Sequence, residues 1–263
     1  MTRAGLRRVP RSVGVLAAVG LAFLVMPVVG LLQRAPWSSL PELLGSEAVL
    51  DALGLSVVVS LAASAIAFVL GLPLALVLAR VELPGMRLIR ALVLLPMVLP
   101  PVVGGTALLF ALGRRGLVGQ WLDRWFDLTL PFTTAGAIVA ATFVSMPFFV
   151  ITVEAALRQA GTDLDEAAAT LGASPLRVLL RVTLPQITPA LAAGAALTWA
   201  RALGEFGATV AFAGNLPGRT QTLPLATFVA LESDPERALA LALVLLAVSL
   251  TVLIALRDRI VIR

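Results

Sequence analysis

Two oppositely charged residues, Arg201 and Glu205, lie within an otherwise apolar stretch of the sequence. A charge in a hydrocarbon environment is costly unless it is paired or hydrated, and a spacing of four residues lets two side chains meet on one face of a helix. One interpretation is an ion pair that locks a helix against its neighbours. In the other, Arg201 lines a path for an anion and Glu205 keeps the anion from binding too tightly, because a conduit must also release its ion.

A second group of polar residues, in the segment 154–189, predicts two short helices. Asp163 is the candidate N-cap of the first helix, and Glu166, three residues later, would complete a capping box. Gly172 suits the left-handed position that follows the end of a helix. Three consecutive alanines between them would give a slim surface that another backbone can approach closely.

The second short helix is predicted to begin directly after this glycine. Ser174 is suited to the N-cap and Pro175 to the first helical position. We expect the helix to run through Leu176–Val182 and to be ended by Pro185. Two capped helices at an angle would form a compact protrusion; the alternative is a capped loop that only joins its neighbours.

Missing residue types exclude much enzyme chemistry. The chain contains no cysteine and no histidine, and all 20 of its basic residues are arginine. It therefore has no thiolate or imidazole metal site, no disulfide and no Cys/His or Ser/His nucleophile system. A P-loop needs a lysine, so any ATPase that drives this protein is on another chain. We expect no catalytic residue, no metal and no cofactor bound by this chain, with ATP and Mg²⁺ held by a partner.

The overall composition indicates that the chain lies in a lipid bilayer rather than in water. Hydrophobic residues make up 59% of the 263 residues and charged residues only 13%, too little polar surface to cover a soluble domain of this length. The net charge of +5 comes from arginines scattered between apolar stretches, whereas nucleic-acid binding needs a basic patch with interleaved aromatics. We therefore predict an all-α integral membrane protein in a lipid bilayer, with no nucleic-acid partner.

Six apolar stretches are long enough to cross about 30 Å of hydrocarbon as helices. The predicted spans are residues 13–32, 53–78, 89–112, 134–152, 190–213 and 238–256. The first is too long for the apolar core of a signal peptide, so we interpret it as a retained span. Residues 1–263 would form one transmembrane domain, with 154–189 as a cytoplasmic loop.

Arginine placement predicts the orientation of these spans. With the N-terminus inside, 13 arginines fall in cytoplasmic segments and 6 in outer segments, leaving Arg201 within a span. Basic residues are enriched in cytoplasmic loops, so both termini are predicted to be cytoplasmic.

Proline and glycine interrupt two of the predicted spans. Pro73 falls in the second span, and Pro100, Pro101, Gly104 and Gly105 fall in the third. Broken helices are tolerated at membrane depth only where protein or water satisfies the freed backbone groups. These residues indicate either packing kinks or a helix break beside a translocation path.

The spacing within the segment 154–189 resembles a family motif. Glu166-Ala167-Ala168, then Gly172, and finally Leu184-Pro185 resemble the EAA motif of ABC-importer permeases, with Val182 where isoleucine is commonest. The resemblance implies a type I ABC-importer permease fold with six transmembrane helices. It also implies a coupling helix that fits a cleft on an ATP-binding subunit. Docking would then rest on Glu166, Ala167, Ala168, Gly172, Leu184 and Pro185.

Segments beyond this loop are similar to one branch of that family. Residues 199–209 and 212–224 look like the corresponding parts of molybdate-transport permeases, and 95–105 is similar to their third-span region. The near rival is the sulfate/thiosulfate permeases, which share the layout. The resemblance implies import of molybdate or tungstate, which the sequence does not separate. Arg201, Glu205, Pro100, Pro101, Gly104 and Gly105 would lie along the path of this divalent oxyanion.

The same resemblance implies an assembly in the prokaryotic inner membrane. Its expected partners are a second copy of this chain, two ATP-binding subunits and an extracytoplasmic oxyanion-binding protein. Because the chain ends at Arg263, soon after the last predicted span, we expect no substrate-sensing domain at the C-terminus.

Two rival functions come from other classes. A secondary transporter or channel would need ionisable residues in several spans, and only Arg201 and Glu205 are clearly there. An intramembrane enzyme would need a histidine, a cysteine or a carboxylate dyad within the spans. Co-purification with a P-loop subunit, lost on Glu166→Lys or Gly172→Asp, would separate the ATP-driven importer from both rivals.

Overall fold

The computed structural model describes residues 10–82 and 84–260, and across these ranges every regular element is a helix. The helices of the first half are α1 (Arg11–Arg34), α2 (Leu40–Leu44), α3 (Glu47–Arg80), α4 (Met86–Val98), α5 (Pro101–Leu112), α6 (Gly119–Phe126) and α7 (Thr134–Ala160). The second half adds α8 (Asp163–Thr170), α9 (Pro175–Val178), the π-helix η1 (Leu179–Thr183), α10 (Leu184–Gln186), α11 (Thr188–Leu203), α12 (Gly207–Phe212), α13 (Leu223–Ser233) and α14 (Pro235–Ile260).

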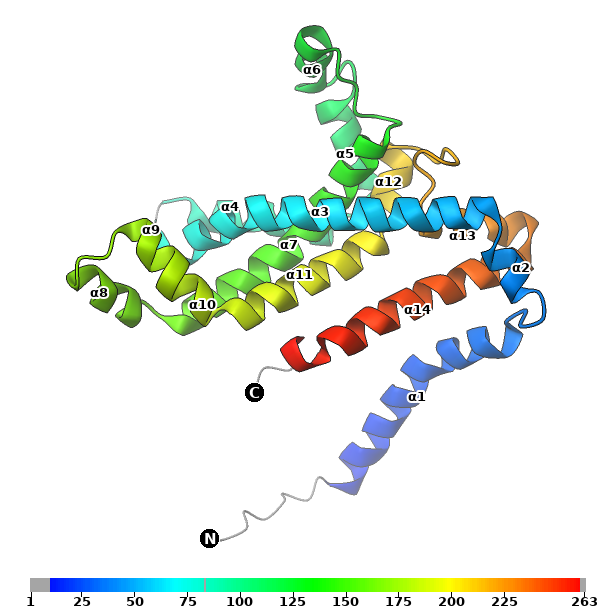
Figure 1. The fold of residues 1–263 in the computed structure, drawn as a ribbon, viewed down its shortest axis with the longest axis horizontal. Coiled ribbons are helices and arrows are strands. Elements are labelled where there is room, and N and C mark those ends of the chain that lie inside the picture. The colour runs from blue at the N-terminus through cyan, green and yellow to red at the C-terminus, as the bar shows by residue number, and fades with distance from the viewer. Residues whose placement is uncertain (1–9, 83, 261–263) are drawn as a thin grey trace.

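A bundle of α3, α7 and α11 forms the centre of the molecule (Figure 1). Phe149 of α7 is fully buried there, and small residues face it from both neighbours. A Cβ atom added at Gly71 of α3 would lie 2.9 Å from the Phe149 ring, and one added at Gly194 of α11 would lie 3.3 Å from it. The two glycines therefore let three helices close around one large side chain.

The remaining helices surround this bundle. In Figure 1, α8 and α9 lie at one end of the bundle and α2 and α13 at the other, while α5, α6 and α12 project to one side. α14 packs on α13 and α11, and α1 lies at the periphery with no buried residue. Such an apolar, unburied helix is suited to lipid rather than to water.

Within residues 10–82 and 84–260, length and composition identify three helices that could cross a membrane, α1, α3 and α7. The number of candidate spans rises to five if each of two bent helix pairs is one span. The bent pairs are α4 with α5 and the run Pro175–Gln186 with α11. The structure therefore supports an all-helical protein with three to five candidate spans.

The predicted third span, 89–112, is not one helix. The chain bends by 118° between α4 and α5, and Leu99 and Pro100 at this bend have extended backbones. A residue before proline is disfavoured in the helical region, and this applies to both residues because Pro100 and Pro101 follow in succession. The two prolines thus produce a helix break, whereas α3 continues through Pro73.

The predicted fifth span, 190–213, is also divided. α11 ends at Leu203, and α12 begins at Gly207. The prediction of a single apolar helix was wrong here because hydropathy alone does not register the backbone turn around Gly204.

The second short helix differs from its prediction as well. It begins as expected, with Ser174 at the N-cap and Pro175 in the first turn, but it does not end at Pro185. A π turn, η1, precedes the proline, the helix continues to Gln186, and the chain then bends by 74° into α11. Because proline has no N–H and crowds the carbonyl four residues before it, the wider π turn accommodates Pro185 without ending the helix.

Candidate functional site

The first short helix, α8, begins one residue earlier than predicted. Thr162 occupies the N-cap position and Asp163 is already helical, so the predicted Asp163–Glu166 capping box is wrong. The Thr162 hydroxyl instead donates a hydrogen bond to Glu166 Oε1 over 2.8 Å. The acidic first turn, which includes Asp163 and Glu166, still complements the positive end of the helix dipole.

Gly172 occupies the left-handed position that the sequence predicts. Its φ is +84°, and its N–H donates to the carbonyl of Ala169 over 2.9 Å. The N–H of Ala173 donates to the carbonyl of Ala168 over 3.1 Å. These two bonds form a Schellman motif, which fixes the turn between α8 and α9.

The other residues of the motif divide between the surface and the core. Glu166, Ala167 and Pro185 are exposed, while Ala168 is half-buried. Leu184 packs instead against the core around Phe149. The structure therefore places most of the predicted docking residues on one accessible segment and turns Leu184 inward.

Three apolar side chains on this segment were not singled out from the sequence. Leu164, Leu171 and Leu176 are 60%, 89% and 65% exposed. Clusters of exposed large apolar side chains beside a polar turn are typical of protein-binding surfaces. The sequence did hold a sign of this exposed surface, namely large apolar leucines beside the alanines in an otherwise polar segment.

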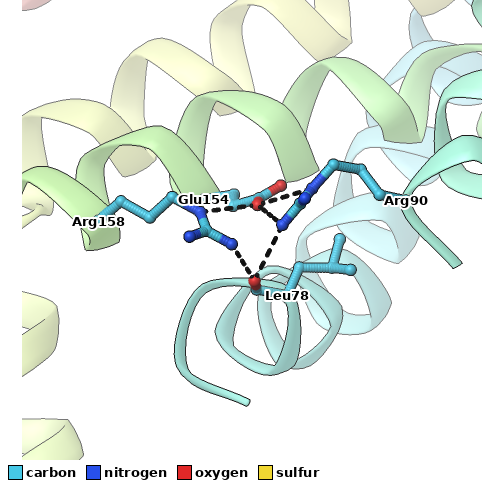
Figure 2. Close-up of polar contacts among 4 residues, drawn as sticks. All are labelled: Leu78, Arg90, Glu154 and Arg158. Carbon is cyan, nitrogen blue, oxygen red and sulfur yellow. Dashed lines mark hydrogen bonds and ion pairs between the residues drawn. The ribbon is translucent and has the colours of Figure 1, made fainter. Parts of the chain in front are cut away.

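A buried carboxylate, that of Glu154, lies near the end of α7 that leads to α8. Figure 2 shows it between Arg90 and Arg158. Oε1 of Glu154 accepts hydrogen bonds from Nη2 of Arg90 over 2.8 Å and from Nε of Arg158 over 2.9 Å. Both arginines also donate to the carbonyl oxygen of Leu78, near the end of α3. The carboxylate is thus neutralised by arginine, and no three acidic side chains in the described part of the chain are grouped as metal ligands.

Arg201 and Glu205 form the predicted ion pair, but not on one helix. Arg201 Nη1 lies 2.7 Å from Oε2 of Glu205, which is outside α11. Among the residues that the structure describes, Oε2 has no hydrogen-bond partner, so this contact is a close ion pair rather than an aligned hydrogen bond. Glu205 is 3% exposed, and its Oε1 accepts the N–H of Ala208 in the first turn of α12 over 2.8 Å. One carboxylate therefore neutralises Arg201 and caps the second half of the broken helix.

The break between α4 and α5 lies close to the break between α11 and α12, and small residues make the contact. A Cβ atom added at Gly105 of α5 would lie 2.5 Å from the carbonyl oxygen of Ala208 in α12. One added at Gly207 would lie 2.7 Å from Cβ of Pro101. The backbones of α5 and α12 are therefore in direct contact, so the structure brings Pro101, Gly105 and the Glu205 cap together.

The two other predicted residues of the third span lie close to this contact. Gly104 faces the ring of Phe143 on α7, where an added Cβ would lie 3.1 Å from the ring. Pro100 occupies the bend itself. Arg201 remains accessible, with 27% of its side chain exposed.

Comparison with known proteins agrees with this architecture. The chain is 45% identical over 250 residues to the molybdenum transport system permease protein ModB of Mycobacterium bovis, covering 95% of this chain and 94% of that protein. It is 38% identical over 228 residues to the sulfate transport system permease protein CysT of Escherichia coli K12, covering 86% of this chain and 82% of that protein.

A solved structure has the same fold. The bacterial alginate ABC transporter, in complex with an alginate pentasaccharide-bound periplasmic protein, superposes with a TM-score of 0.72 at 19% identity, covering 94% of this chain and 91% of that one. Residues 67–263 match the family described as binding-protein-dependent transport system inner membrane component. The chain therefore belongs to the family of inner membrane components of binding-protein-dependent transport systems.

Proposed function

We propose that this chain is the permease subunit of an ATP-driven importer of molybdate or tungstate. The observation that carries the proposal is the 45% identity to a molybdenum transport permease over 95% of the chain. The 38% identity to a sulfate permease makes sulfate the second candidate, since both anions are tetrahedral and divalent.

We infer the assembly from charge, exposure and family membership. Two copies of the chain would enclose a path at their interface, with six spans per copy and both termini in the cytoplasm. The excess of arginine in the segments assigned to the cytoplasm favours this orientation. An extracytoplasmic protein would deliver the oxyanion, and two ATP-binding subunits would supply ATP and Mg²⁺.

We infer that the segment around α8 docks the ATP-binding subunit. Its exposed alanines and leucines, and the turn fixed at Gly172, offer a rigid and partly apolar surface. Closure of the ATPase dimer would then move the permease helices as rigid bodies.

The substrate proposal predicts an order of affinities for the extracytoplasmic partner. We expect the cognate binding protein to bind molybdate and tungstate tightly and sulfate much more weakly, measured by titration calorimetry with each anion. Uptake into vesicles containing the complete transporter should follow the same order. Tight binding of sulfate with none of molybdate would replace the proposed substrate with sulfate.

We also propose that Arg201 lines the anion path. Arg201→Ala is then expected to lower molybdate uptake about tenfold or more, which corresponds to ~1.4 kcal/mol, while the ATP-binding subunits still co-purify. Arg115→Ala removes the same charge from an exposed position and serves as the control.

A double variant separates this role from structural pairing. Removing Arg201 alone leaves the Glu205 carboxylate buried without its cation, which is itself destabilising. Arg201→Ala with Glu205→Gln removes both charges and should restore stability without restoring uptake. Restored uptake in the double variant would show that Arg201 serves only to neutralise Glu205.

A further inference from the structure

The last turn of α3 is held by side chains from three other helices. The carbonyl of Leu78 accepts hydrogen bonds from Arg90 of α4 and Arg158 of α7 (Figure 2). Two residues further along, Arg80 Nη2 lies 3.0 Å from Oδ2 of Asp165 in α8. This turn is therefore a junction at which α8 meets the helices of the bundle.

Asp165 uses both of its carboxylate oxygens at this junction. Oδ2 accepts from Arg80, and Oδ1 accepts from the hydroxyl of Thr183 in η1 over 2.9 Å. The side chains of Arg80 and Asp165 are 23% and 21% exposed, so water only partly screens the pair. One carboxylate thus connects α8 to α3 and to the π turn that leads into α11.

The rest of α8 packs mainly on η1 and α9, the following helices of its own segment, rather than on α3 or α7. The helix has no buried residue, and glycines with positive φ flank both of its ends: Gly161 at +69° and Gly172 at +84°. An added Cβ at either glycine would meet nothing within 4 Å. The Schellman turn fixes Gly172, but glycine can otherwise rotate at low cost. The connection at Gly161 alone would therefore let α8 pivot without moving α3.

Asp165 differs in this respect from the two other acidic residues of the first turn. Glu166 is exposed, and its side chain accepts a hydrogen bond from Thr162 on the same segment and, among the described residues, from no other side chain. Asp163 is exposed and, within the described residues, forms no ion pair. All three complement the helix dipole, so the dipole does not explain why Asp165 is turned inward.

We propose that Asp165 is a positioning residue that ties α8 to the cytoplasmic end of α3, so that movement of α8 is passed to the bundle instead of being absorbed by rotation at Gly161. This inference rests on the proposed function, in which α8 docks the ATP-binding subunit. Its consequence is energetic coupling: without the Asp165–Arg80 pair, ATP is still hydrolysed but less anion is moved for each ATP.

The test uses the complete transporter in proteoliposomes, with molybdate uptake and ATP hydrolysis measured on the same preparation. Arg80→Gln breaks the pair from the α3 side, away from the docking surface, and Asp165→Asn breaks it from the α8 side. We expect both to reduce molybdate transported per ATP about tenfold, while hydrolysis stays within about twofold of the wild type. Asp163→Asn removes the same charge from the same helical turn and should leave the ratio unchanged.

Two further measurements separate coupling from general instability. The exchanged pair Arg80→Asp with Asp165→Arg should recover much of the ratio, since an opposite-charge pair is restored. Because the chain has no native cysteine, spin labels at Val81→Cys and Thr170→Cys can report the spacing of α3 and α8. Their distance distribution should broaden in Asp165→Asn and not in Asp163→Asn.

The inference would be overturned if Arg80→Gln kept the wild-type ratio of transport to hydrolysis, or if the label distances did not change in Asp165→Asn. Failure of the proposed docking has a different signature. If Glu166→Lys retains both the ATP-binding subunits and uptake, then α8 is not the docking helix, whatever the Asp165 variants show.

Discussion

Gly172→Val is expected to prevent stable association with the ATP-binding subunits and to abolish uptake. The backbone at this position has a φ of +84°, a region that costs an L-residue about 1–2 kcal/mol and a β-branched residue more. Space is not the obstacle, because an added Cβ would meet nothing within 4 Å. The penalty would instead open the Schellman turn and change the angle between α8 and α9. Co-purification of the ATP-binding subunits in detergent measures the effect.

Gly172→Asn is the matched control, since asparagine tolerates the left-handed conformation better than other residues with a Cβ. It should retain most of the association that valine removes. Gly172→Asp also tolerates this backbone geometry but adds a charge to the partly apolar docking surface, so it should lose the association that asparagine retains. Equal association for asparagine and valine would show that the left-handed turn is not needed for docking.

Gly105→Ala is expected to destabilise the protein and to reduce uptake strongly. The new methyl group would lie 2.5 Å from the Ala208 carbonyl oxygen and 2.8 Å from Cβ of Ala211. These atoms belong to the backbone of α12 and to an alanine Cβ, so neither can rotate away. Overpacking of this kind costs about 1–3 kcal/mol, and relief would require α5 and α12 to separate. Thermal unfolding in detergent and uptake by vesicles measure the two effects.

Two other glycines serve as controls for Gly105. A Cβ at Gly104 would lie 3.1 Å from the ring of Phe143, a side chain that can shift, so Gly104→Ala should be milder. A Cβ at Gly54 of α3 would meet nothing within 4 Å, so Gly54→Ala should be neutral or slightly stabilising. If all three alanine variants unfold at the same temperature, the close contact between α5 and α12 does not limit stability.

Local features of the site could be predicted from the sequence because their causes lie within a few residues. The left-handed Gly172 and the Ser174-Pro175 start depend on propensities of the residues themselves. The N-cap was misplaced by one residue because Thr162 and Asp163 are adjacent and both suited to capping. Both residue types are favoured at the N-cap, so the sequence pattern does not choose between them.

Long-range features could not be predicted in the same way. Arg80 and Asp165 are 85 residues apart, and Arg90 and Glu154 are 64 apart, so no spacing rule brings them together. The double proline predicted an interruption in the third span, but the angle of 118° is set together with the packing of α5 on α12. In the fifth span, Gly204 and Gly207 lie on either side of Glu205, at the point where α11 ends and α12 begins. These two glycines could have indicated a break in the helix.

The placement of Phe149 between Gly71 and Gly194 has a consequence for how this sequence can change over evolutionary time. The three positions share one fixed volume at the crossing of α3, α7 and α11. A larger residue at either glycine is compatible with the crossing only if position 149 becomes smaller. We therefore expect related chains with a larger residue at position 71 or 194 to have a smaller one at position 149. Substitutions at these three positions should thus occur together rather than singly.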